Sequence, residues 1–188
     1  IKNINPRCKV YGVQAQGAPS MVNAMELHEL HTLDKVSTVA DGIAVKTPGS
    51  LTFELCEKYV DDIVTVSEDE IATAILTLIE QQKLISEGAG AVSVAAAMFN
   101  KLPIANQNIA CVVSGGNIDV TILSRVINRG LMTSGRLSEL TIELLDKPGQ
   151  LKEVASTIAD LGANVVRVHH SPGGNNTDIN GCYLKVSM

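Results

Sequence analysis

A serine, two glycines and an asparagine follow an entirely apolar stretch of the sequence. Residues 109–113 read Ile-Ala-Cys-Val-Val, and the segment Ser114–Asn117 comes directly after them. A continuous apolar run predicts a strand that is covered on both faces, as in a parallel sheet, and ligands of such sheets bind beyond the carboxyl ends of the strands. Gly115 would let the backbone approach a ligand closely, and the Ser114 hydroxyl can donate or accept a hydrogen bond. A tight turn from strand to helix, capped by Ser114, is the alternative, and the residues leave both open.

Other polar residues lie at positions that suit either a ligand-binding site or an ordinary helix start or turn. Glu87 precedes the segment Gly88–Ala91, where the dipole of a helix start favours any carboxylate. Asp41 and Gly42 form a pair that is typical of turns. The histidines and cysteines lack the spacing of metal ligands, and three of the cysteines lie in apolar stretches, so we expect no metal and buried, reduced cysteines. These residues are His28, His31, His169, His170, Cys8, Cys56, Cys111 and Cys182.

A second candidate for ligand binding is the segment Asp146–Leu151, with the sequence Asp-Lys-Pro-Gly-Gln-Leu. Pro148 and Gly149 would leave free backbone amides at the start of a helix, and such amides suit the carboxylate of a small ligand. An ordinary turn between a strand and a helix is the alternative.

The first part of the chain alternates strands and helices, which implies a parallel sheet. Ser67 and Glu70 form a capping box that starts one of the helices. Hydrophobic periodicity predicts strands at 8–13, 63–66 and 109–113, and helices at 18–30, 50–59, 67–84, 92–100 and from Asn117 to 128.

After an expected linker at 129–137, the last third of the chain has a different order of strands and helices. Strands are expected at 139–145, 164–170 and 182–188, a helix at 149–161 and a Gly/Asn-rich turn at 171–181. This β-α-β-β order is the beginning of a ferredoxin-like unit. The chain starts at Ile1 without a methionine and stops at Met188 inside an expected strand, so we expect both ends to be cut.

Composition narrows the class of protein. The 188 residues are 45% hydrophobic and 19% charged, which allows a sizeable core and excludes wholesale disorder. Aromatic residues make up 3% and the net charge is −5, which argues against stacking on nucleic-acid bases and against a basic surface for the phosphate backbone of nucleic acids. The sequence contains neither a long apolar run nor a signal peptide. We therefore expect a cytoplasmic protein that binds neither nucleic acid nor membranes.

Taken together, five segments resemble the threonine ammonia-lyase (threonine dehydratase) family. This family has the tryptophan-synthase-β-like fold and uses pyridoxal phosphate. In addition, Asp146–Leu151 and Gly162–Val165 resemble an ACT regulatory domain, so the combination is similar to the short-form lyases with one C-terminal ACT domain. The five segments are Thr38–Val45, Pro48–Gly49, Tyr59–Ile71, Glu87–Ala91 and Val113–Asp119.

The resemblance implies roles for individual residues. Ser114 would face the pyridine nitrogen of the cofactor, Gly115 would adjoin it, the Gly42 backbone would lie against the ring, and Glu87 would be a nearby carboxylate. The implied reaction is β-elimination from L-threonine or L-serine, which converts threonine to 2-oxobutanoate and ammonia. An effector such as isoleucine or valine would bind at a dimer interface in a homo-oligomer, a dimer or tetramer. Its implied contacts are Asp146, Pro148, Gly149, Gln150, Leu151 and Asn164.

The sequence departs from the family pattern at several positions. The Ser-Phe-Lys motif with the Schiff-base lysine and the tetraglycine phosphate loop are both missing, so we assign no catalytic residue and expect the chain by itself to be inactive. Gln14 and Ser20 replace the acidic residues that bind a divalent metal in some relatives. An amino-acid-sensing module without catalysis is the alternative function.

The expected fold is therefore α/β. Residues 1–128 would form part of a three-layer, parallel-sheet fold of type II pyridoxal-phosphate enzymes. Residues 129–137 would be a linker, and 138–188 an incomplete ferredoxin-like α+β domain of the ACT type. That domain lacks the last helix and the fourth strand, which would leave strand 139–145 as an exposed edge.

Overall fold

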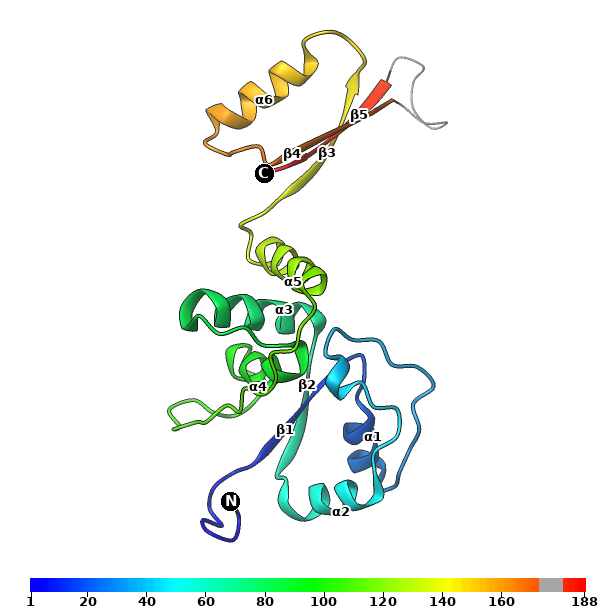
Figure 1. The fold of residues 1–188 in the computed structure, drawn as a ribbon, viewed down its shortest axis with the longest axis vertical. Coiled ribbons are helices and arrows are strands. Elements are labelled where there is room, and N and C mark those ends of the chain that lie inside the picture. The colour runs from blue at the N-terminus through cyan, green and yellow to red at the C-terminus, as the bar shows by residue number, and fades with distance from the viewer. Residues whose placement is uncertain (173–180) are drawn as a thin grey trace. The chain divides into compact units, whose positions relative to one another are not determined.

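The structure, a computed structural model, describes residues 1–172 and 181–188 and separates into two units, Ile1–Leu131 and Met132–Met188 (Figure 1). Most of the expected Gly/Asn-rich turn at 171–181 lies outside the described residues. None of the described helices combines the length and the apolar character that crossing a bilayer requires.

The first unit is built around a parallel pair of strands. Strands β1 (Tyr11–Ala15) and β2 (Asp62–Val66) pair in register from Tyr11 opposite Asp62 to Ala15 opposite Val66. Parallel strands need a crossover connection, and the chain between them supplies α1 (Ser20–Leu27) and α2 (Ser50–Tyr59). Figure 1 places these two helices on one side of the strands and α3 (Glu68–Thr77) and α4 (Gly88–Met98) on the other. The predicted three-layer α/β arrangement is confirmed.

Small and branched side chains form the core of this unit. Val66, Ile71 and Ile75 are fully buried, and alanines of α4 such as Ala91 and Ala95 pack against them. Alanine keeps the backbone of α4 close to its neighbours, so a core almost without aromatic side chains still packs densely.

The start of α3 follows from local sequence. Glu70 donates its backbone N–H to Ser67 Oγ (3.3 Å), and the Ser67 N–H donates to Glu70 Oε2 (2.8 Å). The predicted capping box is confirmed. The α-helix predicted to continue to about residue 84 instead ends at Thr77 and is followed by a π-helical turn, η2 (Leu78–Gln82).

The predicted buried strand at 109–113 is wrong. The segment forms no strand, and Ile109 and Val112 are 51% and 75% exposed. It runs instead along α4, where Ser93 Oγ donates to the Val112 carbonyl (2.8 Å) and Cys111 Sγ to the Ser93 carbonyl (3.6 Å). Within the described residues the parallel sheet consists of β1 and β2 alone, and residues 109–113 pair with neither strand.

Burial of the cysteines also differs from expectation. Cys182 is buried, whereas Cys8 and Cys56 are half-buried and Cys111 is exposed because the segment around it lies on the surface. All four are free thiols.

The second unit has the expected β-α-β-β order. Strands β3 (Glu139–Leu145), β4 (Arg167–Pro172) and β5 (Gly181–Ser187) form an antiparallel sheet in the order β3-β5-β4, and α6 (Gln150–Asp160) connects β3 to β4. Its core contains Ile158, Leu184 and Val186. Before it, α5 (Val120–Thr133) runs through the first half of the segment expected to be a linker.

Asp61 lies where β1 and β2 begin, and its ionisation makes the free energy of unfolding depend on pH. Its carboxylate accepts hydrogen bonds from the ammonium groups of Lys2 and Lys9 and from the Val10 N–H. The Lys2 ammonium first, and then the Val10 N–H and Lys9, hold the pKa of Asp61 well below its usual range. A depressed pKa stabilises the fold above the unfolded-state value of about 3.9, and this contribution is lost as pH falls from there toward the folded-state pKa.

We therefore expect Asp61→Asn to lower the free energy of unfolding at neutral pH and to reduce its loss in acid. Urea unfolding across the acid range measures both effects. Asp62→Asn changes the neighbouring exposed aspartate and is the matched control, which should retain the acid dependence of the unchanged chain. Parallel pH profiles for Asp61→Asn and the unchanged chain would contradict the assignment.

Candidate functional site

Three separate segments of the first unit meet at the start of α4. They are the short 3-10 helix η1 (Asp41–Ile43), Glu87 and the glycine turn after Ser114. Glu87 is the residue that precedes α4, and its backbone N–H donates to the Gly115 carbonyl (3.2 Å). The buried Ser86 hydroxyl donates to the same carbonyl (3.4 Å) and thereby fixes the turn against the helix.

Gly115 lies directly against the Glu87 carboxylate. Its φ is +75°, a left-handed conformation that side chains rarely adopt, and a Cβ there would stand 2.3 Å from Glu87 Oε1. A larger residue would both strain this turn and displace the carboxylate. Glycine at this position is therefore explained by the close approach of Glu87.

Gly42 approaches the same carboxylate from η1. A Cβ on Gly42 would lie 3.4 Å from Glu87 Oε1 and 3.2 Å from Ala89 Cβ. The structure thus brings Gly42, Glu87 and Gly115 together around one carboxylate, although they are far apart in the sequence.

Ser114 contacts the same helix through its backbone. A Cβ on Gly90 would stand 1.7 Å from the Ser114 carbonyl oxygen, so α4 and the turn are in contact here. The Ser114 residue itself is exposed. All four residues expected to contact a cofactor therefore lie around the first turn of α4.

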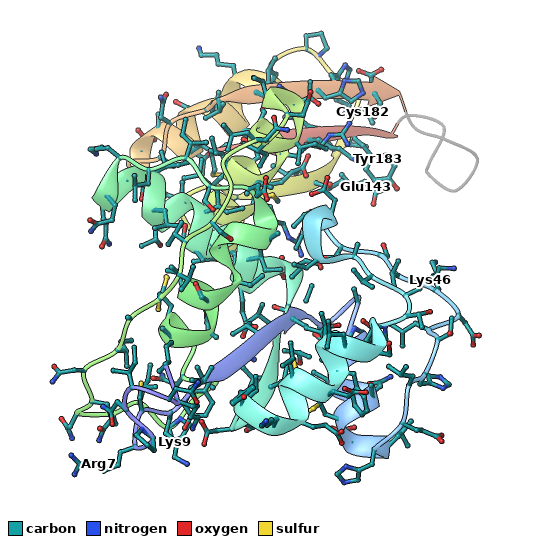
Figure 2. All side chains as sticks on the ribbon, turned by 60° about the horizontal axis from the view of Figure 1, so that its bottom comes forward. Arg7, Lys9, Lys46, Glu143, Cys182 and Tyr183 are labelled. Carbon is teal, nitrogen blue, oxygen red and sulfur yellow. The ribbon has the colours of Figure 1, made fainter. Side chains whose placement is uncertain are left out.

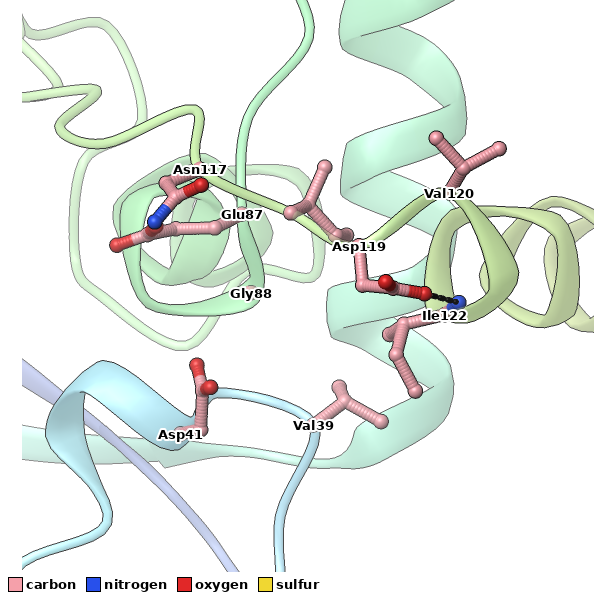
Figure 3. A pocket seen from close by; sticks show the side chains of 9 residues that line it. Val39, Asp41, Glu87, Gly88, Asn117, Asp119, Val120 and Ile122 are labelled. Atoms are coloured by element: carbon pink, nitrogen blue, oxygen red, sulfur yellow. Dashed lines mark hydrogen bonds between the residues drawn. The ribbon is translucent and has the colours of Figure 1, made fainter.

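A cavity of about 490 Å³ opens beside Glu87 (Figure 3). Its size lies within the range of ordinary small-molecule sites. Of the four expected cofactor contacts, Glu87 lines it. The lining residues are Val39, Asp41, Glu87, Gly88, Asn117, Ile118, Asp119, Val120 and Ile122.

Two other carboxylates that line the cavity accept hydrogen bonds from backbone N–H groups at the start of the helix in which or before which each one lies. Asp119 Oδ1 accepts hydrogen bonds from the hydroxyl of Thr121, from its N–H (2.7 Å) and from the Ile122 N–H (3.4 Å), and these bonds, the hydroxyl first, lower the pKa of Asp119. Asp41 Oδ1 accepts the Gly42 N–H (2.8 Å). The sequence indicated Asn117 as part of the Ser114–Asn117 segment but gave Asp119 no role, although an aspartate two residues before Thr121 is a recognisable helix start.

The arrangement fits the ring of pyridoxal phosphate. Gly42 presents only backbone toward Glu87, where an added Cβ would lie 3.4 Å from Oε1, and the cavity of about 490 Å³ opens beside the same carboxylate, so a flat ligand has room there. Among the described residues, no lysine lines the cavity. Gln14 Oε1 accepts the N–H groups of Met21 and Val22 at the start of α1 (3.0 and 2.9 Å).

The expected effector residues lie in the second unit, at opposite ends of α6. Gly149 precedes the helix with φ +98°, and Gln150 and Leu151 are its first residues. Asn164 follows the other end of the helix and is exposed. Eleven helical residues span about 16 Å, so within one chain Asn164 is remote from the Asp146–Leu151 turn, and an effector site that includes both needs two chains.

Comparison with known proteins bears on both units. Residues 1–115 match the family described as "Pyridoxal-phosphate dependent enzyme", and residues 138–180 match the ACT domain. The chain is 47% identical over 188 residues to L-threonine ammonia-lyase of Thermotoga maritima and 41% identical over 170 residues to that of Geobacter sulfurreducens. These alignments cover 100% and 90% of this chain but 47% and 42% of the relatives, so the chain spans less than half of their length.

A solved structure agrees with the fold. The processed form of threonine deaminase isoform 2 from Solanum lycopersicum superposes with a TM-score of 0.64 at 35% identity, covering 70% of this chain and 37% of that one. The resemblance inferred from the five sequence segments is thus confirmed. The chain belongs to the family of pyridoxal-phosphate-dependent enzymes, which its residues 1–115 match, and it carries an ACT domain match over residues 138–180.

Proposed function

We propose that this chain is part of a cytoplasmic, homo-oligomeric threonine ammonia-lyase that converts L-threonine to 2-oxobutanoate and ammonia and also accepts L-serine. The observation that carries the proposal is the meeting of Gly42, Glu87 and Gly115 beside a cavity of about 490 Å³. Two relatives with the printed name L-threonine ammonia-lyase, 47% and 41% identical, support the substrate.

Bound pyridoxal phosphate would supply an electron sink for removal of the α-proton and departure of the β-hydroxyl. The residues of this chain would orient the ring. Gly42 and Gly115 would place only backbone against it, and the Ser114 hydroxyl offers the ring nitrogen a neutral hydrogen-bond partner that does not hold a proton there as an aspartate would. Glu87 Oε1, between the two glycines, can accept a hydrogen bond from a donor on the bound ligand.

The domain division follows the two structural units. We propose that residues 1–128 belong to the catalytic domain, 129–137 to a connection and 138–188 to a regulatory ACT domain. The matched ranges 1–115 and 138–180 support this division. The regulatory part would bind an amino acid such as isoleucine or valine through Asp146–Leu151 of one chain and Asn164 of another.

The proposal is tested with a completed enzyme, in which the parts of the Thermotoga maritima lyase that this chain does not span are joined to it in the order of that enzyme. We expect 2-oxobutanoate from L-threonine, pyruvate from L-serine, and a changed rate when isoleucine or valine is added. A folded completed enzyme that binds pyridoxal phosphate but deaminates neither substrate would overturn the proposal.

The ACT match also favours a second candidate, an amino-acid-sensing module without catalysis. Calorimetry of the completed enzyme and of the isolated chain with isoleucine and valine separates the two. Heat of binding together with no turnover by the completed enzyme would favour the sensing module.

A further inference from the structure

Three side chains with metal-binding atoms meet at one end of the second unit. The carboxylate of Asp146, a ring nitrogen of His170 and the thiol of Cys182 all lie within 4.8 Å of one another. Asp146 directly follows β3, His170 lies in β4, and Cys182 lies at the start of β5. Figure 2 shows Cys182 next to Tyr183 at the beginning of β5, with Glu143 of the neighbouring strand beside them.

The register of the sheet explains why these residues meet. Cys182 pairs with Leu144 on one side, and Leu184 pairs with His170 on the other. Directly paired residues share a face of the sheet, and residues two apart in a strand share it too. His170 and Cys182 therefore lie on the face that carries the buried Leu184, and Asp146 follows Leu144 at the end of the same face.

The three donor types suit one class of ligand. A thiolate, an imidazole and a carboxylate together are typical of zinc sites, whereas calcium and magnesium prefer oxygen donors alone. We propose that Asp146, His170 and Cys182 bind a divalent metal ion of the zinc type, with water in the fourth position. This site goes beyond the proposed lyase function and does not depend on it.

The geometry needs small side-chain adjustments. Zinc bonds of about 2.0–2.3 Å in a tetrahedron place ligand atoms roughly 3.3–3.8 Å apart, and the three atoms already lie within 4.8 Å. Cys182 is buried and fixed, while Asp146 and His170 are exposed, so their side chains can rotate toward the thiol.

Metal binding at this place would act on the turn before α6. Asp146 begins the turn that ends at Gly149, and coordination would tie this turn to β4 and β5. The chain between Leu145 and α6 would then be ordered by the metal as well as by the hydrogen bond from the Lys147 N–H to the Leu145 carbonyl (2.8 Å).

The site is tested by titrating the reduced, metal-free chain with Co²⁺, which replaces zinc and reports its ligands by absorption, and then with Zn²⁺ in competition. We expect one equivalent of Co²⁺ to bind with a thiolate charge-transfer band, and Zn²⁺ to remove the band. His170→Ala and Asp146→Asn should each weaken Co²⁺ binding at least tenfold, by analogy with the loss of a partner in metal sites.

Cys182→Ser should abolish the charge-transfer band. Because Cys182 is buried, the far-ultraviolet circular dichroism spectrum of the Cys182→Ser variant is compared with that of the unchanged chain to detect unfolding. If Cys182→Ser unfolds, the His170→Ala variant still tests the site, because His170 is exposed. His169→Ala, from the opposite face of β4, and Cys111→Ser, the exposed cysteine of the first unit, are matched controls with unchanged binding expected. Failure of the unchanged chain to bind Co²⁺, or equal binding by His170→Ala, would overturn the proposal.

Discussion

Replacing Gly90 with alanine is expected to lower the free energy of unfolding of the isolated chain by about 2 kcal/mol. A methyl group at this position would stand 1.7 Å from the Ser114 carbonyl oxygen and 2.5 Å from Ser86 Oγ. Overpacking of this kind costs about 1–3 kcal/mol, at the upper end when backbone must move. Alanine is otherwise better than glycine inside a helix by roughly 0.5–1 kcal/mol, so the clash has to exceed that gain.

Urea unfolding measures the loss, and amide hydrogen exchange around Gly115 shows whether the turn has moved away from α4. We expect faster exchange of the Glu87 N–H, whose partner is the Gly115 carbonyl. A Gly90→Ala chain as stable as the unchanged one would show that Ser114 does not contact α4 as described.

Replacing Gly42 with alanine is expected to change the free energy of unfolding little but to lower the activity of the completed enzyme strongly. The added Cβ would meet Ala89 Cβ at 3.2 Å and Glu87 Oε1 at 3.4 Å, which small shifts relieve. The same methyl group would occupy space that we assign to the ring of the cofactor. Misplacement of a reacting group by about 1 Å costs on the order of a hundredfold in rate, so we expect a loss of that size in the completed enzyme.

The two glycine variants control each other, because both add one methyl group near Glu87. Urea unfolding of the isolated chain and threonine turnover by the completed enzyme are measured for each. Gly42→Ala with unchanged turnover would remove Gly42 from the cofactor site, even if the fold is as described.

Local patterns predicted the fold where neighbouring residues determine it. The Ser67–Glu70 capping box and the helix at 50–59 depend on residues within one turn of each other, and both are confirmed. The strand at 139–145 is confirmed at the same residues, because the segment is followed by a turn signal at Pro148 and Gly149.

Predictions that depended on distant partners were less successful. The apolar composition of 109–113 indicates burial, but a strand also has to pair with a neighbour in the sheet, and among the described residues this segment pairs with neither β1 nor β2. Its apolar side chains are therefore exposed, with Val112 as the extreme case.

The candidate site shows the same limit. Gly42, Glu87 and Gly115 were each ambiguous from local sequence, since turns and helix starts use the same residues. Only their order and spacing, taken as a family resemblance, indicated a common site. Nothing in the sequence indicated that Asp146, His170 and Cys182 form a common site, because the pairing register of three strands brings them together.

We propose that this chain carries the glycines that contact the cofactor and the regulatory domain of a threonine ammonia-lyase. The most direct test is to measure 2-oxobutanoate formation from L-threonine, with pyridoxal phosphate present, by the completed enzyme and by the isolated chain in parallel. We predict steady turnover by the completed enzyme and none by the isolated chain. No turnover by a folded completed enzyme loaded with pyridoxal phosphate, or turnover by the isolated chain, would contradict the account.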